Sequence, residues 1–138
     1  MSAALGNTCN LKFDFVPQTQ HAKVDTGAET CSVHATDMRE KNGILQCKIL
    51  NHMHTFETYT TKQVKSSNGE SSTRYCVTLP FRMHDKPYEC EFTLNDRSSM
   101  QYPILLGKNF LSANEFMVDV NKTVAMEHKR ILLKSLLK

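Results

Sequence analysis

The chain has 138 residues, of which 40% are hydrophobic and 22% are charged, and its formal net charge is +3. This length and composition are typical of one globular domain covering residues 1–138. The weak positive charge does not indicate nucleic-acid binding. The sequence contains no run of 18 apolar residues, which a membrane span would need.

Short segments rich in β-branched and aromatic residues alternate with turn residues along most of the chain. In chain order, the predicted strands are residues 11–16, 21–24, 30–35, 56–65, 73–79, 78–83, 88–94, 104–106, 117–120 and 123–126. The predicted turns between them are Asp25-Thr26-Gly27, Lys41-Asn42-Gly43, Ser66-Ser67-Asn68-Gly69, His84-Asp85-Lys86-Pro87 and Asn121-Lys122. Asn68-Gly69 is the strongest hairpin signal among them.

Helix is expected at only two places. Residues 110–116, after Leu105-Leu106-Gly107, are predicted to form one or two helical turns. Residues 131–137, in the C-terminal tail 127–138, are expected to form a strand or a short amphipathic helix that docks on the domain or on a partner. Many short strands with little helix indicate a mainly β fold, either a barrel or a sandwich.

The five cysteines are Cys9, Cys31, Cys47, Cys76 and Cys90. An odd number at irregular spacing does not fit a secreted disulfide framework, so we expect mostly reduced, structural thiols. Residues 1–10 lack the charged and apolar regions of a signal peptide. Both observations favour a cytoplasmic location, while a trimmed sequence would leave a periplasmic or secreted one open.

Asp25-Thr26-Gly27 follows the apolar Val24, which places the Asp25 carboxylate at the end of a strand. The same tripeptide also occurs as an ordinary Asx-type turn. In a catalytic interpretation, Gly27 allows a sharp turn with N–H groups facing the carboxylate. Thr26 then donates a hydroxyl hydrogen bond to an opposite loop, and Ala28 leaves room for a peptide. Residues 102–107 are expected to pack behind this turn.

The chain has one such turn, whereas aspartic-peptidase chemistry needs two carboxylates that share a proton. The simplest donor of the second carboxylate is an identical chain across a two-fold axis. In the singly ionised pair, one carboxylate acts as general base on a water and the other donates a hydrogen bond to the scissile carbonyl. We therefore expect a homodimer whose activity falls at high pH, with no cofactor.

Several blocks in a fixed order carry a resemblance to a known family. They are residues 23–28, 31–35, 64–69, 74–75, 92–97, 100, 102–111 and 118–119. The chain resembles the retropepsin-like aspartic peptidases. More closely, it resembles a bacterial and archaeal family labelled ATP-dependent zinc proteases, often found beside ATP-grasp amino-acid ligases such as the ribosomal S6 modification enzyme. The resemblance covers about residues 20–125.

The resemblance implies a small closed barrel that dimerises, with Asp25 as the catalytic residue and Thr26 in the grip between subunits. It also implies that the hairpin at 66–70 is a flap that excludes water and clamps an extended peptide. The candidate catalytic residues are Asp25, Thr26 and Gly27. The candidate substrate-binding residues are Ala28, Glu29, Ser67, Asn68, Gly69 and Arg74.

One departure from the retroviral pattern concerns an ion pair. Retroviral enzymes often have Arg after the Leu-Gly segment and Asp shortly after the catalytic turn, and here these positions are Lys108 and Glu29. We therefore expect Glu29 and Lys108 to pair.

Three further side chains have open roles. His34 either lines the substrate cleft or orients a loop, or it is an ordinary hydrogen-bonded histidine. Asp96 and Arg97 either form a structural pair or bind a charged substrate side chain. Arg74 is the stronger candidate for substrate contact, although a solvated strand arginine fits equally well.

The metal and nucleotide signals are weak. The chain has no His-Glu-x-x-His motif and no phosphate-binding Gly-x-x-x-x-Gly-Lys-Ser/Thr loop. Cys47 with His52 and His54, or Cys31 with His34, offers ligand types that zinc accepts, but alternating histidines are usually polar surface. We expect neither zinc nor a nucleotide.

The sequence thus favours an aspartic endopeptidase that cleaves an extended polypeptide. Association with a ligase would make acidic or glutamate-modified proteins plausible targets, and Lys65 and Arg74 would suit acidic peptides. The alternative is a non-catalytic module of the same fold that binds peptides or an ATP-grasp ligase. Neither interpretation requires a nucleic acid or a membrane.

Overall fold

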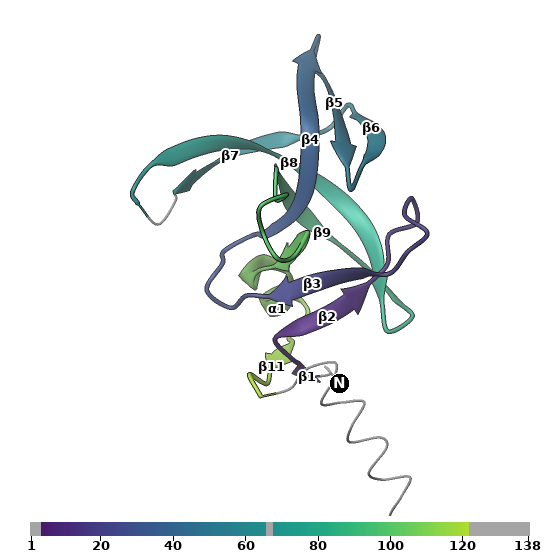
Figure 1. The fold of residues 1–138 in the computed structure, drawn as a ribbon, viewed down its shortest axis with the longest axis vertical. Helices are drawn as coiled ribbons and strands as arrows, with labels where there is room; N and C mark the ends of the chain where they lie inside the picture. Colours follow the sequence, from purple (N-terminus) through teal and green to yellow (C-terminus); the bar gives the residue numbers. More distant parts are fainter. Residues whose placement is uncertain (1–3, 66–67, 122–138) are drawn as a thin grey trace, which may run out of the picture.

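The computed structural model describes residues 4–65 and 68–121, and nearly all of its regular structure is β-strand (Figure 1). The elements in chain order are β1 (Ala4–Leu5), β2 (Thr8–Leu11), β3 (Gln20–Val24), β4 (Cys31–Lys41), β5 (Ile44–Ile49), β6 (His52–Phe56), β7 (Thr60–Lys65), β8 (Ser71–Met83), β9 (Lys86–Asn95), β10 (Ile104–Leu106), α1 (Lys108–Ala113) and β11 (Met117–Val118).

Within these described residues, nine strands form one sheet with the order β2-β3-β10-β4-β9-β8-β7, while β5 pairs with β4 and β6. Lys12, directly after β2, exchanges two backbone hydrogen bonds with Arg82 of β8, at 2.9 and 2.8 Å. The sheet therefore curls back on itself at one isolated bridge. Among the described residues the strand order is open, so the closed barrel implied by the resemblance is not seen as a continuous ladder.

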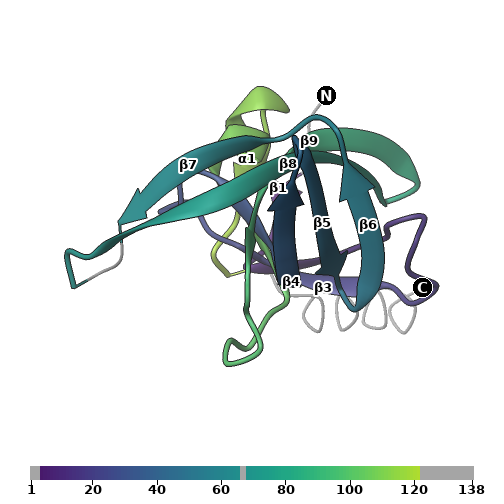
Figure 2. The same cartoon turned by 90° about the horizontal axis from the view of Figure 1, so that it is seen from above.

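Two antiparallel extensions leave the body of the sheet (Figure 2). One is formed by β4, β5 and β6, which lie side by side. The other consists of β7 and the outer part of β8, which pair from Thr60 opposite Cys76 to Lys65 opposite Ser71. We call this second extension, residues 60–65 and 71–76, the ribbon.

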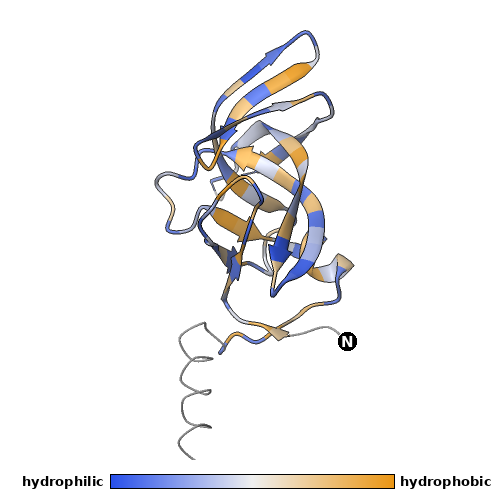
Figure 3. Ribbon diagram, turned by 90° about the vertical axis from the view of Figure 1, so that its right-hand side faces the viewer, coloured by the Kyte–Doolittle hydropathy of each residue, from blue (hydrophilic) through white to orange (hydrophobic). Residues whose placement is uncertain are grey.

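The core is built by strands that alternate hydrophobic and hydrophilic residues, seen as orange and blue bands in Figure 3. Aromatic rings fill its centre: Phe81 lies 5.8 Å from Phe92 and 5.2 Å from Phe110 between ring centroids, and Phe13 lies 5.9 Å from Phe92. Phe13, Phe92 and Phe110 are fully buried. Such aromatic pairs stabilise the core beyond their buried area.

The first predicted strand is misplaced. It was expected at 11–16, but β2 ends at Leu11 and its ladder with β3 covers residues 8–11. Leu11, Phe13 and Val16 are nevertheless buried. The alternating pattern therefore predicted the buried residues correctly, but residues 13–16 pair with no strand.

The hairpin of β5 and β6 was not predicted, and the strand expected at 56–65 is divided. Phe56 ends β6, and β7 begins only at Thr60. The turn between β5 and β6 is formed by Leu50 and Asn51, at φ 50° and 69°. Leucine rarely adopts a left-handed conformation, so Asn51 without a neighbouring glycine gives only a weak turn signal in the sequence.

The strands expected at 73–79 and 78–83 are one continuous strand, β8, which pairs with β7 at its start and with β9 at its end. The helix begins two residues earlier than expected, directly after Gly107, and ends at Ala113. Residues 117–118 pair in parallel with β1 rather than with a following strand. The strand expected at 123–126 and the tail element at 131–137 lie outside the described residues.

Candidate active site

Asp25 lies directly after β3, beside the end of β10. β10 runs parallel to β3, with Leu106 opposite Val24, and antiparallel to β4. The backbone N–H of Asp25 donates to the carbonyl of Leu106 at 2.9 Å, so residues 104–107 pack behind the turn as expected. The Asp25 carboxylate is half-buried, whereas Thr26 and Gly27 are exposed.

Gly27 supports the carboxylate at close range. Its backbone N–H donates to Asp25 Oδ1 at 2.9 Å, which confirms the expected amide facing the carboxylate. The expected conformational role differs, because Gly27 is not among the residues with positive φ. A Cβ added at Gly27 would lie 3.3 Å from Asp25 Oδ1, so the glycine provides room for the carboxylate rather than a special backbone angle.

The segment after β10 clamps the loop that follows Asp25. The backbone N–H groups of Lys108 and Asn109 donate to the carbonyls of Ala28 and Glu29, at 2.8 and 3.1 Å. Gly107 lets the two segments approach, because a Cβ there would lie 2.5 Å from the Thr30 carbonyl oxygen. These contacts fix the backbone on the C-terminal side of Asp25.

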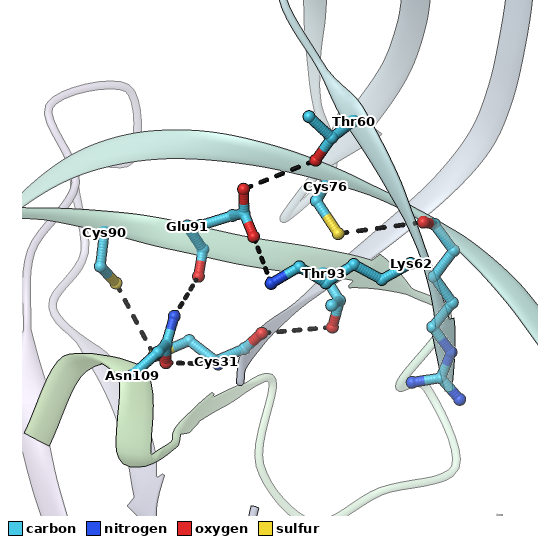
Figure 4. Close-up of polar contacts among 9 residues, drawn as sticks. Cys31, Thr60, Lys62, Cys76, Cys90, Glu91, Thr93 and Asn109 are labelled. Carbon is cyan, nitrogen blue, oxygen red and sulfur yellow. Dashed lines mark hydrogen bonds and ion pairs between the residues drawn. The ribbon is translucent and has the colours of Figure 1, made fainter. Parts of the chain in front are cut away.

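The Asn109 side chain fastens the same loop to the sheet (Figure 4). Its Oδ1 accepts from the backbone N–H of Cys31 at 3.0 Å, and its Nδ2 donates to the carbonyl of Glu91 at 3.1 Å. No motif in the sequence pointed to a role for this residue. Its only signal was its position directly after Gly107-Lys108 in the matched block.

The expected pair of Glu29 and Lys108 is present. Lys108 Nζ lies 3.4 Å from Glu29 Oε1 within the same chain, and both side chains are largely exposed. An exposed pair of this kind contributes little stability. Backbone hydrogen bonds therefore hold this part of the loop, and the exposed ion pair adds little to them.

Arg97 brings a positive charge to the neighbourhood of Asp25. Burial lowers the pKa of Arg97, the nearby charge of Arg74 lowers it further, and the Asp25 carboxylate opposes both effects. Arg97 Nε donates to the carbonyl of Tyr102 at 3.0 Å. Arginine stays protonated under such shifts, so the positive charge of Arg97 lies within electrostatic reach of both the Asp25 carboxylate and the Arg74 guanidinium.

Among the described residues, Asp96 and Arg97 form no ion pair with each other, so the expected structural pair is wrong. Asp96 Oδ1 instead accepts from the backbone N–H of Ser98 at 3.0 Å, and hydrogen bonding to Ser98 lowers the pKa of Asp96. His34 orients this loop, because its Nδ1 accepts from the backbone N–H of Arg97 at 2.9 Å.

The ribbon and the turn at its tip carry the remaining predicted substrate-binding residues. Arg74 is half-buried and lies opposite Lys62, so the two side chains share one face of the ribbon. At the tip, Gly69 has φ +87°, and Asn68 Oδ1 accepts from the backbone N–H of Glu70 at 3.2 Å. This agrees with the expected Asn-Gly turn, while Ser67 lies outside the described residues.

The described part of the chain holds no group of three or more His, Cys, Asp or Glu side chains placed to bind a metal ion. All five cysteines are thiols, and four of them are buried. Burial raises the pKa of Cys47 to about 11, as expected of a structural thiol. Across residues 4–65 and 68–121, none of the helical structure is long and apolar enough to cross a membrane.

Comparison with known proteins adds a family match. Residues 5–129 match the RimB-like family, described as retropepsin-like aspartic endopeptidase RimB. A crystal structure of a Legionella pneumophila protein of unknown function (DUF785) is similar, with a TM-score of 0.69 and 28% identity. The match covers 89% of this chain and 97% of that one.

Two curated relatives are named "Probable alpha-L-glutamate ligase". The protein from Shewanella pealeana is 31% identical over 127 residues, which is 78% of this chain and 26% of the relative. The one from Shewanella halifaxensis is 30% identical over 124 residues, which is 76% of this chain and 25% of the relative. This chain therefore spans about a quarter of the length of these relatives.

Proposed function

Because the chain belongs to the RimB-like family of retropepsin-like aspartic endopeptidases, we propose that it hydrolyses peptide bonds as a homodimer with one Asp25 from each subunit. The observation that carries this proposal is the half-buried Asp25 carboxylate, which accepts the Gly27 N–H at 2.9 Å and is backed by Leu106. A water between two such carboxylates is the nucleophile, activated by the ionised member of the pair.

The surface beside Asp25 suits a second copy. Thr26 and Gly27 are exposed next to the carboxylate. Asn7 links this turn to the C-terminal side of the chain, because its carbonyl accepts from Val24 N–H at 2.8 Å and its Nδ2 donates to the Val120 carbonyl at 2.7 Å. Val120 and Met117 are 68% and 69% exposed. Large apolar side chains in this position favour burial against a partner.

We propose that the substrate is acidic, with glutamate-bearing polypeptides as the first class to test. Arg97, whose charge interacts with both Asp25 and Arg74, supports this choice, because guanidinium groups bind carboxylates in bidentate geometry. The relatives named as glutamate ligases support it as well, since part of each of them is similar to this chain. An ATP-grasp ligase that adds glutamate is the corresponding partner.

The first prediction concerns the catalytic carboxylate. Asp25→Asn is expected to lower hydrolysis of an acidic peptide at mildly acidic pH by about a hundredfold or more, because the pair loses its general base. Light scattering should show a dimer for both proteins, and chelators should leave wild-type activity unchanged.

A monomeric wild type, or peptide binding without turnover, would favour the alternative of a non-catalytic peptide- or ligase-binding module. Activity that disappears with a chelator and survives Asp25→Asn would indicate a zinc enzyme instead.

The second prediction concerns Arg97. Arg97→Gln is expected to raise KM for a glutamate-rich peptide about tenfold or more, because a charge-assisted hydrogen bond to the substrate is lost. KM for a neutral peptide should change much less. Arg39→Gln, at an exposed position of β4, removes the same charge and serves as the control. Equal effects on both peptides would mean that Arg97 only supports its loop through Tyr102.

A further inference from the structure

Glu91 of β9 lies between the ribbon residues Thr60 and Lys62 and the side chain of Asn109 (Figure 4). On one side its carboxylate contacts Lys62 Nζ at 2.5 Å and accepts from Thr60 Oγ1 at 3.5 Å. On the other side its backbone carbonyl accepts from Asn109 Nδ2 at 3.1 Å. One residue therefore contacts both the ribbon and the segment that clamps the Asp25 loop.

The contacts of Glu91 lie where the ribbon leaves the sheet. Cys76 is the last ribbon residue with a partner on each side, Thr60 in β7 and Thr93 in β9. Beyond it, β7 and β8 pair only with each other within the described residues. Lys62 is two residues further out, and among the ion pairs of residues 4–65 and 68–121 only Lys62–Glu91 joins the ribbon to the body of the protein.

The pair is better placed than an ordinary surface ion pair. The side chains of Lys62 and Glu91 are 40% and 33% exposed, so solvent and salt screen them less than fully exposed charges. The hydrogen bond to Glu91 is the largest influence that raises the pKa of Lys62, which keeps the ammonium charged across neutral pH.

A continuous series of hydrogen bonds leads from Glu91 to the Asp25 loop. Asn109 Oδ1 accepts from the Cys31 N–H at 3.0 Å, and the Asn109 N–H donates to the Glu29 carbonyl at 3.1 Å. Cys31 and Glu29 border the loop that begins at Asp25. A shift of β9 at Glu91 would therefore move Asn109, and with it the loop that carries the Asp25 carboxylate.

We propose that the Lys62–Glu91 pair fixes the orientation of the ribbon relative to β9. Asn109 in turn fixes β9 relative to the Asp25 loop. Lys62 and Glu91 are positioning residues, and the inference rests on the proposed function. Without the pair, the ribbon swings away from the body more often, and a substrate must order it on binding. The cost then falls on substrate binding rather than on the chemical step.

The test combines peptide kinetics with hydrogen exchange. Lys62→Met and Glu91→Gln are each expected to raise KM for an extended peptide about three- to tenfold, with kcat changed less than about twofold. Amide exchange in residues 60–65 and 71–75 should rise by a similar factor, with the melting temperature near that of wild type. The double variant should resemble either single one, and the swapped pair Lys62→Glu with Glu91→Lys should recover most of both readouts.

Lys48→Met is the matched control, because it removes a lysine from the Asp37–Lys48 ion pair of β4 and β5, at 3.4 Å, outside the ribbon. It should leave KM and ribbon exchange unchanged. Unchanged ribbon exchange in the Lys62 and Glu91 variants, or effects that simply add in the double variant, would overturn the proposal. Hydrogen exchange requires no turnover, so an inactive wild type would contradict the proposed function without obscuring this result.

Discussion

A mixture of roughly one part wild-type chain and nine parts Asp25→Asn chain, after subunit exchange, is expected to show about one-hundredth of the activity of pure wild type at the same total protein concentration. Each active site needs a carboxylate from both subunits, so only dimers of two wild-type chains hydrolyse substrate. Their share falls with the square of the wild-type fraction. Independent sites in single chains would instead retain about one-tenth.

The control for this mixing experiment is wild type exchanged with Arg39→Gln at the same ratio, which should keep nearly full activity. Arg39 is an exposed residue of β4, and its loss does not remove a carboxylate. Native mass spectrometry should show that mixed dimers have formed in both samples. A loss proportional to the wild-type fraction, with mixed dimers present, would contradict a shared pair of Asp25 carboxylates.

The parts of the fold that were predictable are those with local signals. Asn42 and Gly43 adopt left-handed angles, φ 54° and 76°, between β4 and β5, where Asn-Gly marked a turn. The turn at Leu50 and Asn51 uses similar angles with leucine in the first position and no glycine, so its hairpin left a weaker mark. Burial was predicted better than pairing, as Phe13 shows, because alternation reports burial and not the strand partner.

The candidate site divides in the same way. Asp25 and its backing by Leu106 could be predicted because each belongs to a short motif. The roles of Arg97 and Asn109 could not, because they depend on contacts between distant segments: Arg97 with the field of Asp25 and Arg74, and Asn109 with Cys31, 78 residues away in sequence. A residue that clamps a loop is marked by no local sequence pattern, so its role becomes visible only in the folded sheet.

Gly107→Ala is expected to lower the free energy of unfolding by about 2–3 kcal/mol or more, because it overpacks a site that cannot relax. The new Cβ would lie 2.5 Å from the Thr30 carbonyl oxygen and 2.9 Å from that of Ala28, both backbone atoms. The Lys108 N–H bond to Ala28, at 2.8 Å, holds this backbone in place. Urea denaturation measures the loss. Gly43→Ala is the control, because a Cβ there has no atom within 4 Å and the cost comes only from φ +76°, about 1–2 kcal/mol. An equal or smaller loss for Gly107→Ala would mean that the Asp25 loop yields easily, contrary to a rigidly presented carboxylate.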